Sequence, residues 1–81
     1  MKLTRTTINP APKDNMITFI GVCPDYPWPT IMLWNEHDDA WVYSMVGVCE
    51  MEDGTLDSWF ENEQTKTITA WAALPEPWRE E

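Results

Sequence analysis

Apolar and polar positions alternate along much of this chain with a period of two, which is typical of β-strands. The apolar positions are rich in β-branched and aromatic side chains, which favour a pleated surface. Four segments carry this pattern and are predicted to be strands: residues 16–22, 30–35, 40–48 and 66–72. The sequence therefore predicts a mainly β protein with a small antiparallel sheet of about four strands.

The segments between these strands carry turn signals. The polar linker at residues 36–39 has the length of a hairpin loop, and Asp-Gly at residues 53–54 supplies the positive φ of a turn. Prolines alternate with other residues between positions 23 and 29, so we expect a rigid Pro-rich loop there.

Residues 56–63 fit two structures. Ser58 and Glu61 have the spacing of a capping box, which would start a helix, whereas the neighbouring Trp-Phe pair fits a strand. We favour a strand or an irregular crossing, with at most one short helical turn in the whole protein.

The chain is long enough for one domain, near the size at which a single core is only just sufficient. Residues 1–15 are polar and basic, lack an apolar pattern and contain two prolines, so they are predicted to form a flexible N-terminal arm. Residues 16–78 are predicted to form a single β-rich domain, and residues 79–81 a frayed tail. Trp71 and Leu74 are expected to close the core near the C-terminus.

The charge balance is strongly acidic, with five Lys and Arg against fourteen Asp and Glu and a net charge of −9. No Lys or Arg occurs from Asp14 to Thr65, a span that carries eleven acidic residues. Such a field repels nucleic acid and anionic membranes and attracts basic surfaces. Solubility is the alternative explanation. We expect a protein partner with a basic surface, no direct nucleic-acid binding and no membrane binding.

The sequence shows no catalytic, cofactor-binding or metal-binding signature. Its three glycines stand alone, so there is no phosphate-binding loop, and one His with two distant Cys makes a poor zinc site. Residues 36–39 cannot all converge on one cation from a hairpin tip. Carboxylate pairs such as Glu61 and Glu63 lack the partly dry cleft that acid–base chemistry requires. We expect no enzyme, no catalytic residue, no cofactor and no metal.

Cys23 and Cys49 could form one disulfide. The N-terminus lacks the apolar segment of a secretory signal, and no window is long enough to cross a bilayer. We therefore expect a cytoplasmic protein in which both thiols are buried and reduced.

The predicted binding surface combines carboxylates with aromatic anchors. The acidic clusters at residues 36–39 and 50–53 lie at the two ends of the strand 40–48, about 25–30 Å apart, so they form separate patches. Trp34 and Trp71 are assigned to the core, whereas the face of the strand 40–48 that carries its aromatic residues is left for a partner. The predicted partner-binding residues are Asp25, Glu50, Glu52, Asp53, Asp57, Trp41, Tyr43 and Trp59.

Four motifs stand along the chain in the order Phe19-Ile20-Gly21-Val22, Pro24-Asp25, Ile31-Met32-Leu33-Trp34 and Trp71-x-x-Leu74-Pro75-Glu76-Pro77. In this order they resemble the small phage and prophage proteins grouped as domain of unknown function 551. That family typically shows Trp-Ile-Ser-Val, Leu-Pro-Glu, an apolar strand and a closing Thr-His-Trp-Met-Pro-Leu-Pro-Glu-Pro. The resemblance covers roughly residues 18–78 and is most specific in the closing segment. Phe19 replaces the opening Trp, and Ala70 replaces the His.

The resemblance implies a bacteriophage or prophage origin, a small β-rich fold and the cytoplasm of a bacterial host, and it carries no established activity. Together with the acidic span, it favours an accessory protein that binds and inhibits a host protein through an acidic surface. The target would be a nucleic-acid-handling or defence complex, as for anti-CRISPR proteins and DNA mimics. One alternative is a self-assembling or structural phage protein, in the simplest case a homodimer. Another is a binder of a small ligand or glycan.

Overall fold

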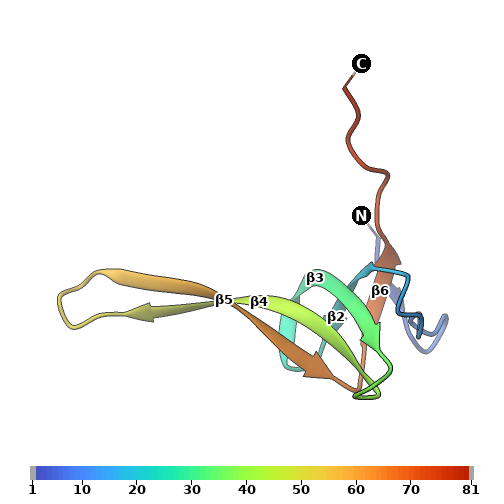
Figure 1. Ribbon diagram of the computed structural model, residues 1–81, viewed down its shortest axis with the longest axis horizontal. Helices are drawn as coiled ribbons and strands as arrows, with labels where there is room; N and C mark the ends of the chain where they lie inside the picture. Colours follow the sequence, from blue (N-terminus) through green and yellow to red (C-terminus); the bar gives the residue numbers. More distant parts are fainter. Residues whose placement is uncertain (1, 81) are drawn as a thin grey trace.

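The computed structural model describes residues 2–80, and strands are the only regular elements within that range. The strands are β1 (Thr4–Arg5), β2 (Phe19–Cys23), β3 (Tyr26–Asn35), β4 (Ala40–Glu50), β5 (Leu56–Thr65) and β6 (Ala70–Ala73). They form one antiparallel sheet of six strands in the order β1-β6-β2-β3-β4-β5. The sheet curls into a half-barrel, from which a long hairpin and the C-terminal tail project in different directions (Figure 1). The predicted mainly β, antiparallel fold is confirmed, whereas the predicted number of about four strands is wrong.

The two additional strands have different origins. β5 is the ambiguous segment, and it pairs with β4 over its whole length, from Glu50 opposite Leu56 to Trp41 opposite Thr65. This long ladder satisfies far more backbone groups than one capped helical turn would. β1 contains only two residues, which pair with β6, and so short a strand leaves no periodic pattern in the sequence.

The predicted Pro-rich loop is not seen, because only residues 24–25 form a turn and the prolines that follow lie within β3. Pro27 and Pro29 lie where the pairing of β3 with β2 shifts register. On the other side of β3, pairing with β4 begins only at Met32. A proline cannot donate a ladder hydrogen bond, and these positions require none.

The predicted last strand is much shorter than expected and begins at Ala70. The preceding threonines form a side-chain turn instead, in which the Thr65 hydroxyl donates to the Thr67 carbonyl over 3.0 Å and accepts from the Thr67 N–H over 3.2 Å. Such local hydrogen bonds compete with a strand ladder. The Thr69 N–H then donates to the Val22 carbonyl and leads the chain into β6.

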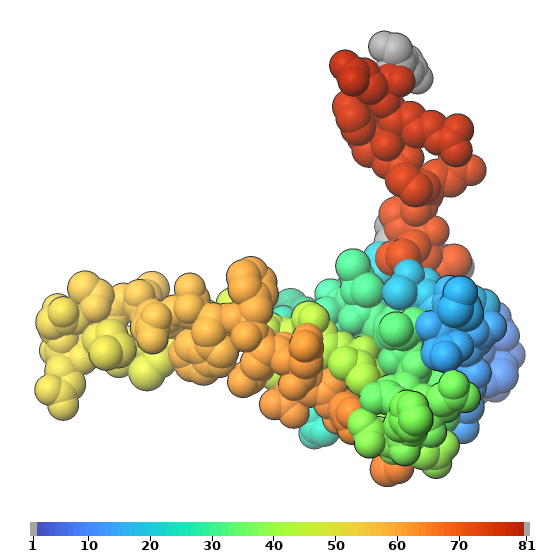
Figure 2. Space-filling view, in the orientation of Figure 1, coloured from blue at the N-terminus to red at the C-terminus, as the bar shows by residue number. Residues whose placement is uncertain are grey.

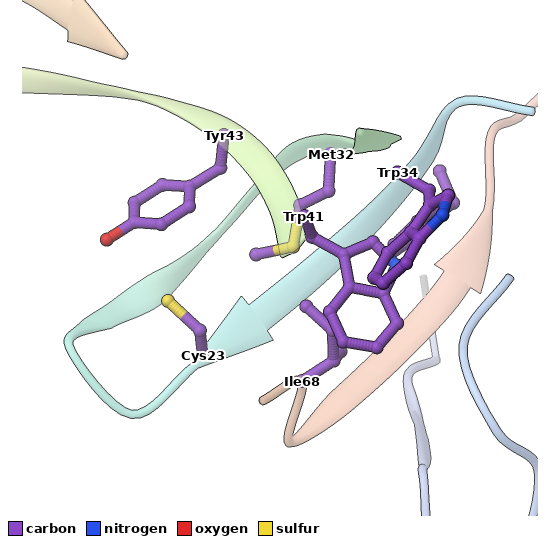
Figure 3. Close-up of a cluster of buried hydrophobic side chains, with 7 residues drawn as sticks. Cys23, Met32, Trp34, Trp41, Tyr43 and Ile68 are labelled. Atoms are coloured by element: carbon purple, nitrogen blue, oxygen red, sulfur yellow. The ribbon is translucent and has the colours of Figure 1, made fainter. Parts of the chain in front are cut away.

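The core lies on the concave face of the half-barrel (Figure 3). Its buried side chains come from three strands and from the segment before β6: Phe19, Cys23, Met32, Trp34, Trp41, Tyr43 and Ile68. The rings of Trp34 and Trp41 meet edge to face at 4.9 Å, and Trp71 meets Phe19 in the same way at 5.7 Å. Trp34 and Trp71 thus pack in the core as predicted, whereas Leu74 is exposed.

Part of the N-terminal arm lies against this core. The indole N–H of Trp41 donates to the Pro12 carbonyl and that of Trp71 to the Asn9 carbonyl, each over 2.8 Å. The Lys13 ammonium lies 5.0 Å from the centre of the Trp34 ring, within the range of a cation–π interaction. Met1 of the predicted arm and Glu81 of the predicted tail lie outside the described residues.

Removing residues 2–13 should therefore destabilise the protein rather than only shorten it. Two hydrogen bonds at about 1 kcal/mol each and a cation–π contact of about 0.5–1 kcal/mol predict a loss near 3 kcal/mol. Urea denaturation monitored by tryptophan fluorescence measures it. The single variant Lys13→Met, which removes only the charge above the rings, should lose about 1 kcal/mol or less. Equal stabilities of the full and shortened chains would contradict this role of the arm.

Candidate functional site

The β4–β5 hairpin extends beyond the body of the protein. β3 pairs with β4 only as far as Tyr43, whereas the β4–β5 ladder continues to Glu50 and Leu56. Residues 44–62 therefore form a two-stranded segment, the projecting hairpin, about 24 Å long. The space-filling view shows it as a narrow extension of the body (Figure 2).

The tip of the projecting hairpin is a tight turn. The Met51 N–H donates to the Thr55 carbonyl over 2.7 Å, and the Gly54 N–H donates to the Met51 carbonyl over 3.0 Å. Gly54 has φ of 86°, as predicted from the Asp-Gly pair. The Asp53 carboxylate accepts from both the N–H and the hydroxyl of Thr55, which fixes the turn locally.

Side chains hold the two strands of the projecting hairpin together. At its base, the Thr30 hydroxyl donates to the Ser44 carbonyl and the Ser44 hydroxyl donates to the Asn62 side-chain oxygen. Farther out, the indole of Trp59 lies over Gly47, where any larger side chain would displace it. The hairpin is therefore an ordered extension of the sheet.

The two faces of the projecting hairpin differ sharply in charge. Directly paired residues share a face, and the face that continues from the buried Tyr43 carries the carboxylates. On this acidic face β5 places Asp57, Trp59, Glu61 and, at the hairpin base, Glu63, whereas β4 places Met45, Gly47 and Cys49 beside them. The opposite, apolar face carries Val46, Val48, Leu56 and Phe60, together with the polar residues Ser44, Ser58 and Asn62 and, at its outer end, Glu50. The hairpin is amphipathic across its thickness.

The structure brings together four of the predicted partner-binding residues at the hairpin tip. Glu50, Glu52 and Asp53 surround the turn, and Asp57 stands opposite Cys49 on the neighbouring strand. Asp25 does not join them, because it lies in the turn between β2 and β3 on the body.

The three predicted aromatic anchors separate into core and surface. Trp41 and Tyr43 are only 7% and 4% exposed, because the curled sheet packs both side chains into its concave face. They are core residues and are therefore excluded from the candidate contact surface. Trp59, which is 43% exposed, lies among the carboxylates of the acidic face, and its indole N–H donates to Glu61 over 3.3 Å.

The other acidic cluster, residues 36–39, lies at the opposite end of β4 from the hairpin tip. It has partners in the body: the Asp38 carboxylate accepts from Gln64 over 2.6 Å, and the Lys66 ammonium donates to the Asp39 carbonyl over 3.1 Å. The prediction of two separate acidic patches agrees with this arrangement. The patch on the hairpin is the one remote from Lys66.

Sequence reasoning missed the apolar face of the projecting hairpin. Its signal was present, because the acids of β5 occupy positions 57, 61 and 63, whereas the alternate positions from 56 to 64 carry no charge. Because residues 56–63 fitted both a helix and a strand, this period of two was not recognised.

Local interactions shift two pKa values near these surfaces. The Thr55 hydroxyl and N–H, which donate to Asp53, hold the pKa of that carboxyl below its usual range. Burial, reinforced by the neighbouring Cys23 thiol and by nearby acids, raises the pKa of Tyr43 to about 12. The first shift keeps the tip negatively charged, and the second keeps the core neutral.

The cysteines occupy different environments. Both thiols are free, and Cys23 is buried, but Cys49 is exposed on the hairpin, so the prediction that both are buried is wrong for Cys49. Over residues 2–80, no three His, Cys, Asp or Glu side chains are grouped to hold a metal ion. In the same range no helix could span a membrane.

Comparison with family models, curated proteins and solved structures finds no match to this chain. The resemblance to domain of unknown function 551 therefore stays a prediction.

The pKa of Tyr43 makes a testable contribution to stability at high pH. In the unfolded chain the phenol ionises near pH 10, whereas in the folded protein it keeps its proton to about pH 12. Stability should therefore be unaffected by this group below pH 10 and fall by up to about 1.4 kcal/mol per pH unit between pH 10 and 12. The variant Tyr43→Phe should lack this part of the decline. Urea denaturation of both proteins at pH 8 and pH 11 tests it, and parallel losses would contradict the assignment.

Proposed function

We propose that this protein is a binding module that presents the projecting hairpin to a basic surface of another protein. The observation that carries the proposal is the charge of the hairpin. Residues 44–62 include the five acids Glu50, Glu52, Asp53, Asp57 and Glu61 and no Lys or Arg. Such a segment attracts and orients a positively charged surface.

The geometry supports binding in two further ways. Trp59 is a large, partly exposed side chain among carboxylates, and aromatic residues of this kind often supply the apolar anchor of an interface. The ladder with β4 and the Asp53–Thr55 turn also order the hairpin before any partner arrives. Pre-organisation reduces the entropy that binding would otherwise lose.

The kind of target follows from the family resemblance rather than from the hairpin alone. A phage accessory protein would find basic surfaces on host proteins that handle nucleic acid or defend against phage. Binding there would block access of the nucleic acid and inhibit the complex. Catalysis plays no part in this proposal.

Removing charge from the hairpin should weaken binding to such a partner. In the triple variant Glu50→Ser, Glu52→Ser, Asp57→Ser we expect at least tenfold weaker binding and a smaller dependence on salt. Asp53 is left intact because its carboxylate holds the turn. The measurement is how much partner the tagged protein retains from bacterial lysate over a salt gradient, followed by titration of the purified partner.

A matched control is Glu36→Ser, Glu76→Ser, Glu80→Ser, which removes the same charge from exposed positions outside the hairpin. This variant should bind like the natural sequence. If both triple variants lose affinity equally, net charge rather than the hairpin determines binding, and the proposal fails.

A further inference from the structure

Within residues 2–80, no segment packs on the apolar face of the projecting hairpin. Val46 is 45% exposed, Val48 61%, Leu56 72% and Phe60 85%. A two-stranded ribbon is at best marginally stable alone in water, and ribbons usually pack one face against another layer. This hairpin lacks that layer.

The distribution of charge favours a second copy of this chain as the missing layer. A net charge of −9 would normally oppose self-association. Here Asp57, Glu61 and Glu63 all lie on the acidic face, so two hairpins can meet through their apolar faces with these carboxylates pointing outwards. A basic partner would instead be drawn to the acidic face, because the apolar face offers almost no charge to select it.

The order of side chains along the apolar face is self-complementary. We propose that two hairpins stack antiparallel through this face. The two-fold axis runs between them, perpendicular to the strands, at the level of the Gly47–Trp59 pair. Residues equally distant from the axis then lie opposite each other. The large Phe60 of one copy faces the small Ser58 of the other, and Val46 faces Val48.

The one carboxylate on this face also fits that register. Glu50 pairs with Leu56 at the outer margin of the hairpin, three residues beyond the axis. The two-fold places it over Ser44 of the second copy, next to Asn62, whose side-chain NH₂ group can donate a hydrogen bond to a carboxylate. The same two-fold sets Leu56 over the Asn62 side chain, so each end of the interface pairs the Glu50–Leu56 margin of one copy with the Ser44–Asn62 base of the other.

The area is sufficient for a specific but moderate association. The four apolar side chains expose on the order of 400 Å² per copy, comparable with the largest patch on a typical monomer. With the serine and asparagine positions between them, a pair of copies approaches the roughly 1,000 Å² that specific interfaces need. The C-terminal tail, the other projecting segment, leaves the body in a different direction and does not cover this face (Figure 1).

Sedimentation velocity of the purified full chain over a micromolar concentration series tests the stacked dimer. We expect the mass to rise from 9.5 kDa to twice that value. High salt should preserve or strengthen the dimer, because it screens the net negative charge. The variant Phe60→Ser should weaken dimerisation at least tenfold, and Ser58→Glu, which leaves every apolar contact in place but puts charge at the centre of the face, should abolish it.

The control variant is Asp57→Ser. Asp57 precedes Ser58 in the chain but lies on the opposite, acidic face, so this variant should dimerise like the natural sequence. Circular dichroism confirms that each variant keeps its β structure. A chain that stays monomeric at the highest concentration overturns the proposal. So does a dimer that survives both Phe60→Ser and Ser58→Glu, or one that Asp57→Ser disrupts as strongly. None of these outcomes bears on the acidic face as a site for a basic protein.

Discussion

The shape of this protein depends on the unequal pairing of β4 with its two neighbours. β5 follows β4 along almost its whole length, whereas β3 leaves it after Met32 pairs with Tyr43. Continuing that register would set Pro29 opposite Val46 and Pro27 opposite Val48. Prolines cannot extend a ladder, so the sheet ends on that side, and the β4–β5 pair continues alone.

The same alternation that builds the core continues into the projecting hairpin and acquires a different use there. Within the body, every second residue of β4 points into the concave face, as Trp41 and Tyr43 do. Beyond Met45, which still packs against the core, the period of two in the β4–β5 pair separates the carboxylates of β5 from the apolar side chains instead. β4 thus contributes to the core of the body and, together with the carboxylates of β5, to two chemically distinct surfaces, one suited to a basic partner and one suited to its own copy.

The N-terminal arm shows how so small a sheet can keep its aromatic core dry. The curled sheet leaves one side of the core open, and the arm lies there, fixed by the indole N–H groups of Trp41 and Trp71. Lys13 of the arm adds a cation–π interaction, because its ammonium lies 5.0 Å from the centre of the Trp34 ring and 5.6 Å from that of Trp41. Each tryptophan therefore fills the core and satisfies its polar atom at the same time.

Local sequence determined where β2, β3 and β4 lie, the turn at the hairpin tip and the acidic character of its surroundings. Alternation, β-branched residues and an Asp-Gly pair act over a few residues, so they can be recognised without knowing the fold. The clustering of Glu50, Glu52, Asp53 and Asp57 also follows from one hairpin. Only the tertiary structure decided that Trp41 and Tyr43 belong to the core, that Asp25 lies apart and that Phe60 is exposed. Burial depends on which segments distant in sequence cover a face. Here β3 ends its pairing with β4 early, and its prolines reveal this only once the register between the two strands is known.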